Sequence, residues 1–298
     1  MNTSAGLRTS PLHPLFGVEV HDLDLRAVTA TDGYAALRQA FEEHSLLLFR
    51  DQELDDEAHL SFGALWGPIE NRAKDADVGP PRMANVSNRL DDATIAAVDD
   101  LRTLDLMANQ LWHTDSTFLP VPALANILAA RVLSSVGGET ELVSTRAAWH
   151  DMPAALKDRI RDGVIRHRLA HSRAALSPEL AAQHLARWPD RMWRAIWPNP
   201  VTGDESLYIA SHSVAVEGLS LDEGQRLIAE LIEYCTQPQR VYTHRWQPGD
   251  VLVWDERATL HRGRPWPYHE ERTLASICIS ASDADGVALV RPRAVGAS

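Results

Sequence analysis

The sequence predicts a mainly β protein, a β-sandwich or jelly roll that carries helical decorations. Short apolar runs recur along the chain between clusters of turn-forming residues, a pattern typical of all-β sandwiches and jelly rolls. A smaller number of segments have the apolar spacing of amphipathic helices. No repeat, low-complexity block or Pro/Gly/Ser-rich linker divides the 298 residues. We therefore expect one domain over residues 1–298, a length that all-β proteins often reach as a single unit.

Helices are predicted where apolar residues return every three to four positions. Residues 34–44 have this spacing and lead into the apolar run 45–49, which favours a buried strand. Residues 55–66 form a second predicted helix, because Asp55 and Asp56 can cap its N-terminus. The clearest helix is 221–234, in which Leu227, Ile228, Leu231 and Ile232 form one stripe.

Strands are predicted in the apolar segments that turn formers bound. Gly137 and Gly138 separate two such segments, and Pro248 and Gly249 separate two more. Proline fixes one φ and glycine accepts a positive one, so these positions favour tight turns. The predicted strands are 123–133, 139–144, 240–246, 251–255 and 273–280.

Two regions have no clear sheet pattern. Residues 71–105 combine few periodic apolar positions with several turn formers, and a loop of that length often covers a binding site as a lid. Residues 149–200 are predicted as a helical insertion, with helical spacing at 149–162, broken at Pro153, and again at 178–187. These two regions are expected to decorate the β core.

Composition limits the class of partner. The net charge is −12 and the isoelectric point is near 5.5, which argues against nucleic acid and anionic membrane surfaces as partners. Cys235 and Cys278 are the two cysteines, too few for a disulfide framework. The N-terminal residues lack a signal-peptide core, and the most apolar stretch, 121–133, is shorter than a membrane span. We expect a soluble, cytoplasmic protein that acts on a small molecule.

Two distant segments carry residues suited to binding a metal ion. His113 and Asp115 lie two positions apart, so on an extended chain they face the same side. His261 lies in the second segment, 254–263. Two imidazoles and one carboxylate make the facial triad that holds non-haem Fe(II) and leaves coordination positions open.

A His-x-acid pair can also occur by chance. With thirteen histidines, about one His-x-acid pair is expected by accident, and His269 with Glu271 is such a pair. A lone histidine is usually a satisfied or solvent-exposed imidazole. His167 and His171 have helical spacing that suits a metal, but no third ligand accompanies them.

The residues that flank the triad carry a family resemblance. The matching segments keep a fixed order over nearly the whole chain: 11–16, 22–26, 108–113, 137–141, 146–148 and 260–264. Through them the chain resembles the TauD/TfdA family of Fe(II)- and 2-oxoglutarate-dependent dioxygenases. The resemblance implies a double-stranded β-helix, which agrees with the predicted jelly roll. It leaves open whether the chain forms a homo-oligomer.

The resemblance also implies roles for five residues. His113, Asp115 and His261 match the family's iron ligands. Arg272 matches the arginine that forms a salt bridge with the distal carboxylate of 2-oxoglutarate, and Thr140 matches a threonine that hydrogen-bonds it. A guanidinium fork suits a carboxylate bidentately. The implied reaction uses Fe(II), 2-oxoglutarate and O2 to oxidise a substrate C–H bond.

One departure from the family bears on the substrate. Taurine and phenoxyacetate dioxygenases have a second arginine four residues beyond the co-substrate arginine, and here that position is Ser276. The loss of this charge favours a bulkier, mostly apolar natural product. We therefore expect a tailoring step of antibiotic biosynthesis, as in actinobacterial dioxygenases that oxidise pentalenolactone-type sesquiterpenoids. Replacement cations could come from the lid, and tryptophans of the insertion could line the pocket: Arg72, Lys74, Arg82, Arg89, Trp188, Trp193 and Trp197.

Three alternatives remain. The first is an aryloxyalkanoate dioxygenase that acts on compounds like 2,4-dichlorophenoxyacetate. The second is a zinc hydrolase with the same ligands, which would need a general base near the metal. The third is a non-catalytic jelly-roll binding module.

Overall fold

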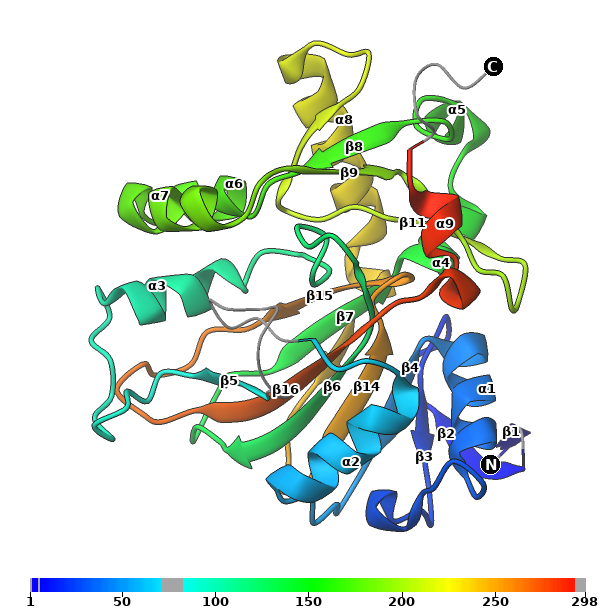
Figure 1. The fold of residues 1–298 in the computed structure, drawn as a ribbon, viewed down its shortest axis with the longest axis vertical. Coiled ribbons are helices and arrows are strands. Elements are labelled where there is room, and N and C mark those ends of the chain that lie inside the picture. Colours follow the sequence, from blue (N-terminus) through cyan, green and yellow to red (C-terminus); the bar gives the residue numbers. More distant parts are fainter. Residues whose placement is uncertain (1, 5, 71–82, 293–298) are drawn as a thin grey trace.

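The computed structural model describes residues 2–4, 6–70 and 83–292 (Figure 1). The helices are α1 Tyr34–His44, α2 Asp56–Trp66, α3 Leu101–Ala108, α4 Thr145–Asp151, α5 Ala154–Asp158, α6 Leu169–Ala174, α7 Pro178–Arg187, α8 Leu221–Cys235, α9 Val287–Val290, and the 3-10 turns η1 Leu25–Ala27, η2 Pro238–Arg240 and η3 Asp283–Asp285. The strands are β1 Asn2–Ser4, β2 Leu7–Pro11, β3 Val18–Val20, β4 Leu46–Phe49, β5 Ala84–Ser87, β6 Ala123–Val132, β7 Thr140–Ser144, β8 Val164–His167, β9 Arg191–Arg194, β10 Ile196–Pro198, β11 Glu205–Leu207, β12 Ser213–Val216, β13 Tyr242–His244, β14 Val251–Asp255, β15 Thr259–Gly263 and β16 Thr273–Ser280.

Two sheets form the jelly roll that the sequence predicts. The larger sheet has the strand order β1-β2-β3-β4-β14-β6-β16-β5, and the smaller one has the order β13-β7-β15. Figure 1 shows α1 and α2 beside the larger sheet, and α3, α6 and α7 across the open end of the roll. Strands β1 to β4 follow one another in the sequence, whereas the neighbours from β4 to β5 in the larger sheet, and all three strands of the smaller sheet, come from distant parts of the chain, as in a double-stranded β-helix.

The central strands are buried on both faces because the larger sheet separates two cores. Along β14, Val251 and Val253 pack into an outer core with α1 and α2. Leu252 and Trp254 point the other way, into an inner core between the two sheets. Alternate residues of a strand face opposite sides, so a continuous apolar run is what such a strand needs.

The region predicted as a helical insertion contains both helices and strands. Helices α6 and α7 fall within 149–200, but β8, β9 and β10 do as well. Strand β8 lies between β12 and β9 in a three-stranded sheet, and α8 packs on that sheet through Leu227 and Ile228. The predicted helix 149–162 is divided into α4 and α5 around Pro153, because a proline ring removes a helix hydrogen bond and clashes with the preceding turn.

Part of the predicted lid loop, 71–105, lies outside the described residues. This part is 71–82, and it contains Arg72, Lys74 and Arg82. The remainder of the predicted lid is not simply a loop. It contains β5, which pairs with β16, and the start of α3, which Asp100 caps by accepting from the backbone N–H of Arg102. The lid cation that is described, Arg89, is exposed and forms an ion pair with Glu271 at 3.5 Å.

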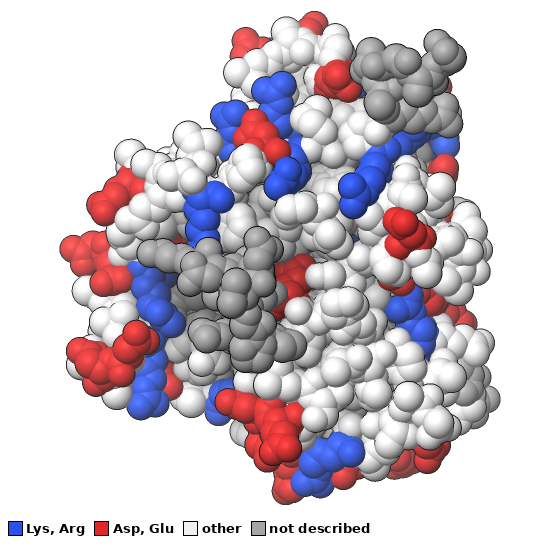
Figure 2. All heavy atoms as spheres, viewed as in Figure 1, with Lys and Arg blue, Asp and Glu red and all other residues white. Residues whose placement is uncertain are grey.

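Charged side chains are interspersed on the face shown in Figure 2, where Lys and Arg lie among Asp and Glu and uncharged surface. Opposite charges placed close together in this way weaken the long-range field of each. None of the helices in the described ranges is long and apolar enough to cross a membrane.

Two buried histidines should make the stability of the fold depend on pH. Burial lowers the pKa of His59 to about 4 and that of His167 to about 3, from the ordinary value of 6.5. Both stay neutral in the fold, while the unfolded chain takes up protons below pH 6.5. The free energy of unfolding should therefore fall as pH drops from 6.5 towards 4, by up to about 1.4 kcal/mol per pH unit for each histidine.

Urea unfolding at pH 7.0 and pH 5.5 tests this expectation. The variant H167L removes one titrating group, so its loss of stability between the two pH values should be smaller than that of the wild type. Equal losses in both proteins would show that His167 does not contribute.

Candidate metal centre and active-site cavity

His113 and His261 are joined directly through their backbones. The His113 N–H donates to the carbonyl of His261 at 3.0 Å, and the His261 N–H donates to the carbonyl of His113 at 2.8 Å. His261 belongs to β15, so this bridge attaches the segment after α3 to the smaller sheet. The two imidazole rings lie 4.2 Å apart, centroid to centroid.

The structure brings His113, Asp115 and His261 into one cluster. One ligand atom from each lies within 4.8 Å of the others. The Nδ1 atom of His113 lies 2.7 Å from the carbonyl oxygen of Leu111, so Nδ1 carries the proton and Nε2 remains as the ligand atom. That Nε2 lies 4.0 Å from Oδ1 of Asp115. Two imidazoles and a carboxylate at this spacing fit a divalent iron ion.

Glu256 supports the cluster from behind. Its fully buried carboxylate accepts from the Asp115 backbone N–H at 2.8 Å, from Trp254 Nε1 at 2.7 Å and from the Thr114 hydroxyl at 2.7 Å. Burial, with Asp115 nearby, raises the pKa of Glu256 well above its usual range. Since its oxygens are engaged in the protein interior, Glu256 does not line the cavity. It fixes the backbone of Asp115.

Arg272 is a buried cation beside the same cavity. The side chain donates from Nε and Nη2 to the carbonyl of Gly138, at 3.1 Å and 2.7 Å, and its guanidinium lies 5.1 Å from the Trp266 ring centroid. A Cβ on Gly138 would lie 2.7 Å from Nε of Arg272, so only glycine allows this approach. Within the described parts of the chain, no carboxylate lies within ion-pair distance of this guanidinium.

Burial lowers the pKa of Arg272 to about 10. A buried guanidinium without a counter-ion is unfavourable by itself. It therefore fits an anionic ligand such as the distal carboxylate of 2-oxoglutarate.

Thr140 is buried at the start of β7, and it lies next to a cavity residue without lining the cavity itself. Its hydroxyl oxygen accepts from Trp246 Nε1 at 3.0 Å, which leaves the hydroxyl proton for another acceptor. Its backbone pairs with Gly263, which lines the cavity, but Thr140 itself does not. Its hydrogen bond to 2-oxoglutarate stays a prediction.

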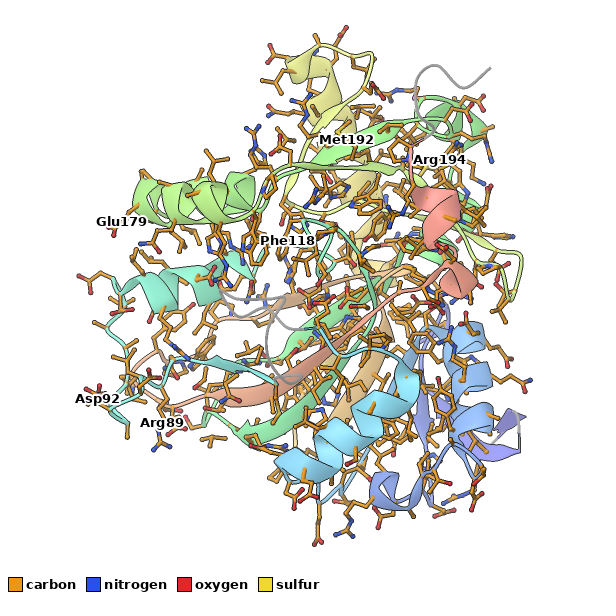
Figure 3. All side chains as sticks on the ribbon, viewed as in Figure 1. Arg89, Asp92, Phe118, Glu179, Met192 and Arg194 are labelled. Atoms are coloured by element: carbon orange, nitrogen blue, oxygen red, sulfur yellow. The ribbon has the colours of Figure 1, made fainter. Side chains whose placement is uncertain are left out.

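The cavity has a volume of about 270 Å³ and holds the three candidate ligands and Arg272 in its wall. Aromatic side chains supply much of the rest. Phe118 and Trp188 contact each other at 5.5 Å between ring centroids, and Trp266 lies by Arg272. Figure 3 shows Phe118 between the roll and the layer that contains β8 and β9.

Of the three tryptophans predicted to line the pocket, the structure places Trp188 there. Trp193 and Trp197 are in the outer core instead, and their indole N–H groups donate to the carbonyls of Thr117 and Asp285. They pack the insertion against the roll because a large aromatic body with one polar atom suits such a contact.

Sequence analysis did not identify Asn126 or Glu256 as site residues. Asn126 donates from Nδ2 to Oδ2 of Asp115 at 2.8 Å. Asn126 is a polar residue inside the apolar strand β6, and that contrast was the available signal, whereas Glu256 lies among charged residues in the turn after β14 and gives no such signal. His167 and His171 join no metal-binding group among the residues that the structure describes, and His167 is fully buried.

Comparisons with known proteins agree with this geometry. The family model described as "Taurine catabolism dioxygenase TauD, TfdA family" matches residues 8–278. The alpha-ketoglutarate-dependent 2,4-dichlorophenoxyacetate dioxygenase of Cupriavidus pinatubonensis is 34% identical over 89% of this chain and 94% of its own. The crystal structure of AAD-2 in complex with Mn(II) and N-oxalylglycine has a TM-score of 0.85 and 30% identity, over 93% of this chain and 98% of that one.

A relative that is named for pentalenolactone F has a lower sequence identity to this chain. The pentalenolactone F synthase of Streptomyces arenae is 27% identical over 83% of this chain and 86% of its own. The cavity geometry and the full-length family match agree on one class of chemistry. The chain belongs to the TauD/TfdA family and is an Fe(II)- and 2-oxoglutarate-dependent dioxygenase.

Proposed function

We propose that this dioxygenase oxidises a C–H bond of a small, largely apolar aromatic acid of the aryloxyalkanoate class. In this proposal His113, Asp115 and His261 hold Fe(II), and Arg272, assisted by Thr140, holds the distal carboxylate of 2-oxoglutarate. The observation that carries the assignment is the buried guanidinium of Arg272, which has no carboxylate within ion-pair distance among the described residues, in the same cavity as the three ligands. Together, Fe(II) and 2-oxoglutarate supply oxidative decarboxylation of the co-substrate coupled to oxidation of a substrate C–H bond.

The protein's own residues bind and orient the reactants, and they exclude water. Leu111 selects the His113 tautomer, Glu256 fixes the Asp115 backbone, and Gly138 aims the Arg272 guanidinium. The aromatic wall of Phe118, Trp188 and Trp266 excludes water from the reacting centre and offers faces to an aryl ring. These residues position the reactants and leave the oxidation to the cofactors.

The substrate class follows from similarity and from the cavity wall. The relative named for 2,4-dichlorophenoxyacetate is more similar to this chain than the one named for pentalenolactone F, by 34% to 27% identity. This favours the aryloxyalkanoate alternative over the sesquiterpenoid expectation. The aromatic wall can pack against the flat aryl ring of such a substrate. The carboxylate of the substrate also needs a cation in the cavity.

Arg187 is our candidate for the cation that contacts the substrate carboxylate. The position of the family's second arginine is Ser276, whose hydroxyl donates to Asn126. Arg187, at the end of α7, is exposed at the cavity and lies over the Trp188 ring at 4.6 Å.

A zinc hydrolase is less well supported. Such an enzyme needs a carboxylate or imidazole base that faces the metal-bound water. The nearest additional carboxylate, Glu256, is engaged by three donors behind the cavity wall. A buried Arg272 would also have no role in that chemistry.

The direct test is product formation by the Fe(II)-loaded enzyme with 2-oxoglutarate and O2. We expect 2,4-dichlorophenoxyacetate to be oxidised and a pentalenolactone-type sesquiterpenoid lactone to be left unchanged. Oxidation of the lactone alone would contradict the proposed substrate class and restore the natural-product interpretation.

The variant R187L tests the substrate contact. Loss of one charged hydrogen bond costs about 1.5 kcal/mol, so KM for the aryloxyacetate should rise roughly tenfold while KM for 2-oxoglutarate stays the same. R194L is a matched control, because Arg194 lies on β9 away from Phe118 (Figure 3). An unchanged KM for the acid in R187L would exclude Arg187 as its contact.

A further inference from the structure

The inner faces of β6 and β16 carry polar residues next to the candidate metal centre. Asn126 and Cys278 are direct partners in the register of these two antiparallel strands. Ser276 precedes Cys278 by two positions on β16, so it points to the same side. On the opposite face, Ile127 and Ile277 pack into the outer core. Strand alternation therefore collects Asn126, Ser276 and Cys278 inside the roll.

These residues form a hydrogen-bond chain that ends on a candidate metal ligand. The Ser276 hydroxyl donates to Oδ1 of Asn126 at 3.0 Å. The amide Nδ2 of Asn126 donates to Oδ2 of Asp115 at 2.8 Å. The thiol of Cys278 donates to the same Oδ2 at 3.5 Å. Asn126 is 4% exposed and Ser276 is 5% exposed, so little of either side chain is open to bulk water.

Only one orientation of the Asn126 amide satisfies both neighbours. An ionised Asp115 can only accept hydrogen bonds, so Asn126 must turn its NH2 group towards it. The amide oxygen then faces Ser276, whose hydroxyl can donate. A flipped amide would place its oxygen against the Asp115 carboxylate, and two acceptors would oppose each other in a buried site. Ser276 thus locks the amide.

The lock holds the Asp115 carboxylate in one orientation. Oδ2 of Asp115 accepts from Asn126 and Cys278, and Oδ1 lies 4.0 Å from Nε2 of His113. Turning the carboxylate away from the imidazoles of the triad would break these hydrogen bonds, and a buried donor left without its acceptor is unfavourable.

We propose that Asn126, locked by Ser276, is a positioning residue that holds the Asp115 carboxylate through Oδ2 in the orientation that faces the two imidazoles. This rests on the proposed function, in which Asp115 binds the metal. It also assigns a task to Ser276 at the place where the sequence departs from its family. Ser276 acts on the metal centre through Asn126 and does not contact the substrate's charge. Partners of a ligating carboxylate in this position are worth roughly 10- to 100-fold in metal affinity.

The test is Mn(II) affinity of the metal-free full-length protein, measured by calorimetry or by the EPR signal of free Mn(II). N126A should raise the Kd for Mn(II) by about 10- to 100-fold. N126L has a similar volume but lacks the donor and adds no charge, so it should also bind weakly if N126A does not fold. S276A should weaken binding less, and S276T should restore it because the hydroxyl returns.

N199A is a matched control. Asn199 is 6% exposed and donates to Glu42, outside the cavity wall. It should lose thermal stability while its Kd for Mn(II) stays at the wild-type value. A second readout is the visible spectrum of the Co(II)-loaded protein, whose intensity depends on coordination number. In N126A this spectrum should change, because the released carboxylate can turn at the metal.

Failures of this inference and of the proposed function are distinguishable. If N126A and N126L bind Mn(II) like the wild type while H261A does not bind it, the positioning role of Asn126 is overturned and the ligand assignment stands. If H261A also binds normally, the ligand assignment itself is overturned. A wild-type Kd in S276A overturns the lock assigned to Ser276.

Discussion

Replacing His261 with alanine is expected to abolish turnover and the visible charge-transfer band of the anaerobic complex with Fe(II) and 2-oxoglutarate. His261 supplies one of three ligand atoms that lie within 4.8 Å of each other. The two that remain, from His113 and Asp115, are adjacent on one segment and no longer form a face. We expect the rate to fall by at least about a thousandfold, a barrier increase of roughly 4 kcal/mol. Stopped-flow absorbance and product analysis measure the two effects.

A second buried histidine provides the control. His244 on β13 is 1% exposed and contacts Trp246 and Asp250, outside the cavity wall. H244A should lose stability yet keep the charge-transfer band in its folded fraction. A band of wild-type intensity in H261A would contradict the ligand assignment.

Replacing Arg272 with leucine is expected to raise the 2-oxoglutarate requirement far more than the substrate requirement. Its guanidinium is buried, fixed by Gly138 and without a carboxylate partner among the described residues. Removing one partner of a buried charge pair costs about 2–5 kcal/mol, so KM for 2-oxoglutarate should rise between about 30-fold and several thousandfold. Steady-state kinetics with each reactant varied in turn separates the two requirements.

R272K tests the geometry of the contact. Lysine keeps the positive charge but loses the planar fork, so it should recover only part of the affinity for 2-oxoglutarate. Mn(II) affinity measured without 2-oxoglutarate should be unchanged in R272L, because Arg272 is not a metal ligand in this assignment. An unchanged KM for 2-oxoglutarate would mean that another residue holds the distal carboxylate.

The sequence alone determined the local elements and the class of chemistry. Apolar runs bounded by turn formers predicted β14 and β16, and helical spacing predicted α1 and α7, at the observed residues. These elements could be predicted because the pattern that marks each of them is formed by residues that are neighbours along the chain. Flanking motifs carried the family resemblance, which the comparisons confirm.

Only the tertiary structure decided what surrounds the ligands. Asn126 and Ser276 lie 150 residues apart, and they meet because β16 pairs with β6 in one register. The strands β8 and β9 were missed for a similar reason, since they are short and their partners lie elsewhere in the chain. Hydrogen bonds across strands and the burial of Glu256 depend on long-range packing, which local periodicity does not record. The sequence therefore predicted the three residues that cluster as candidate ligands, and the residues that orient them required the fold.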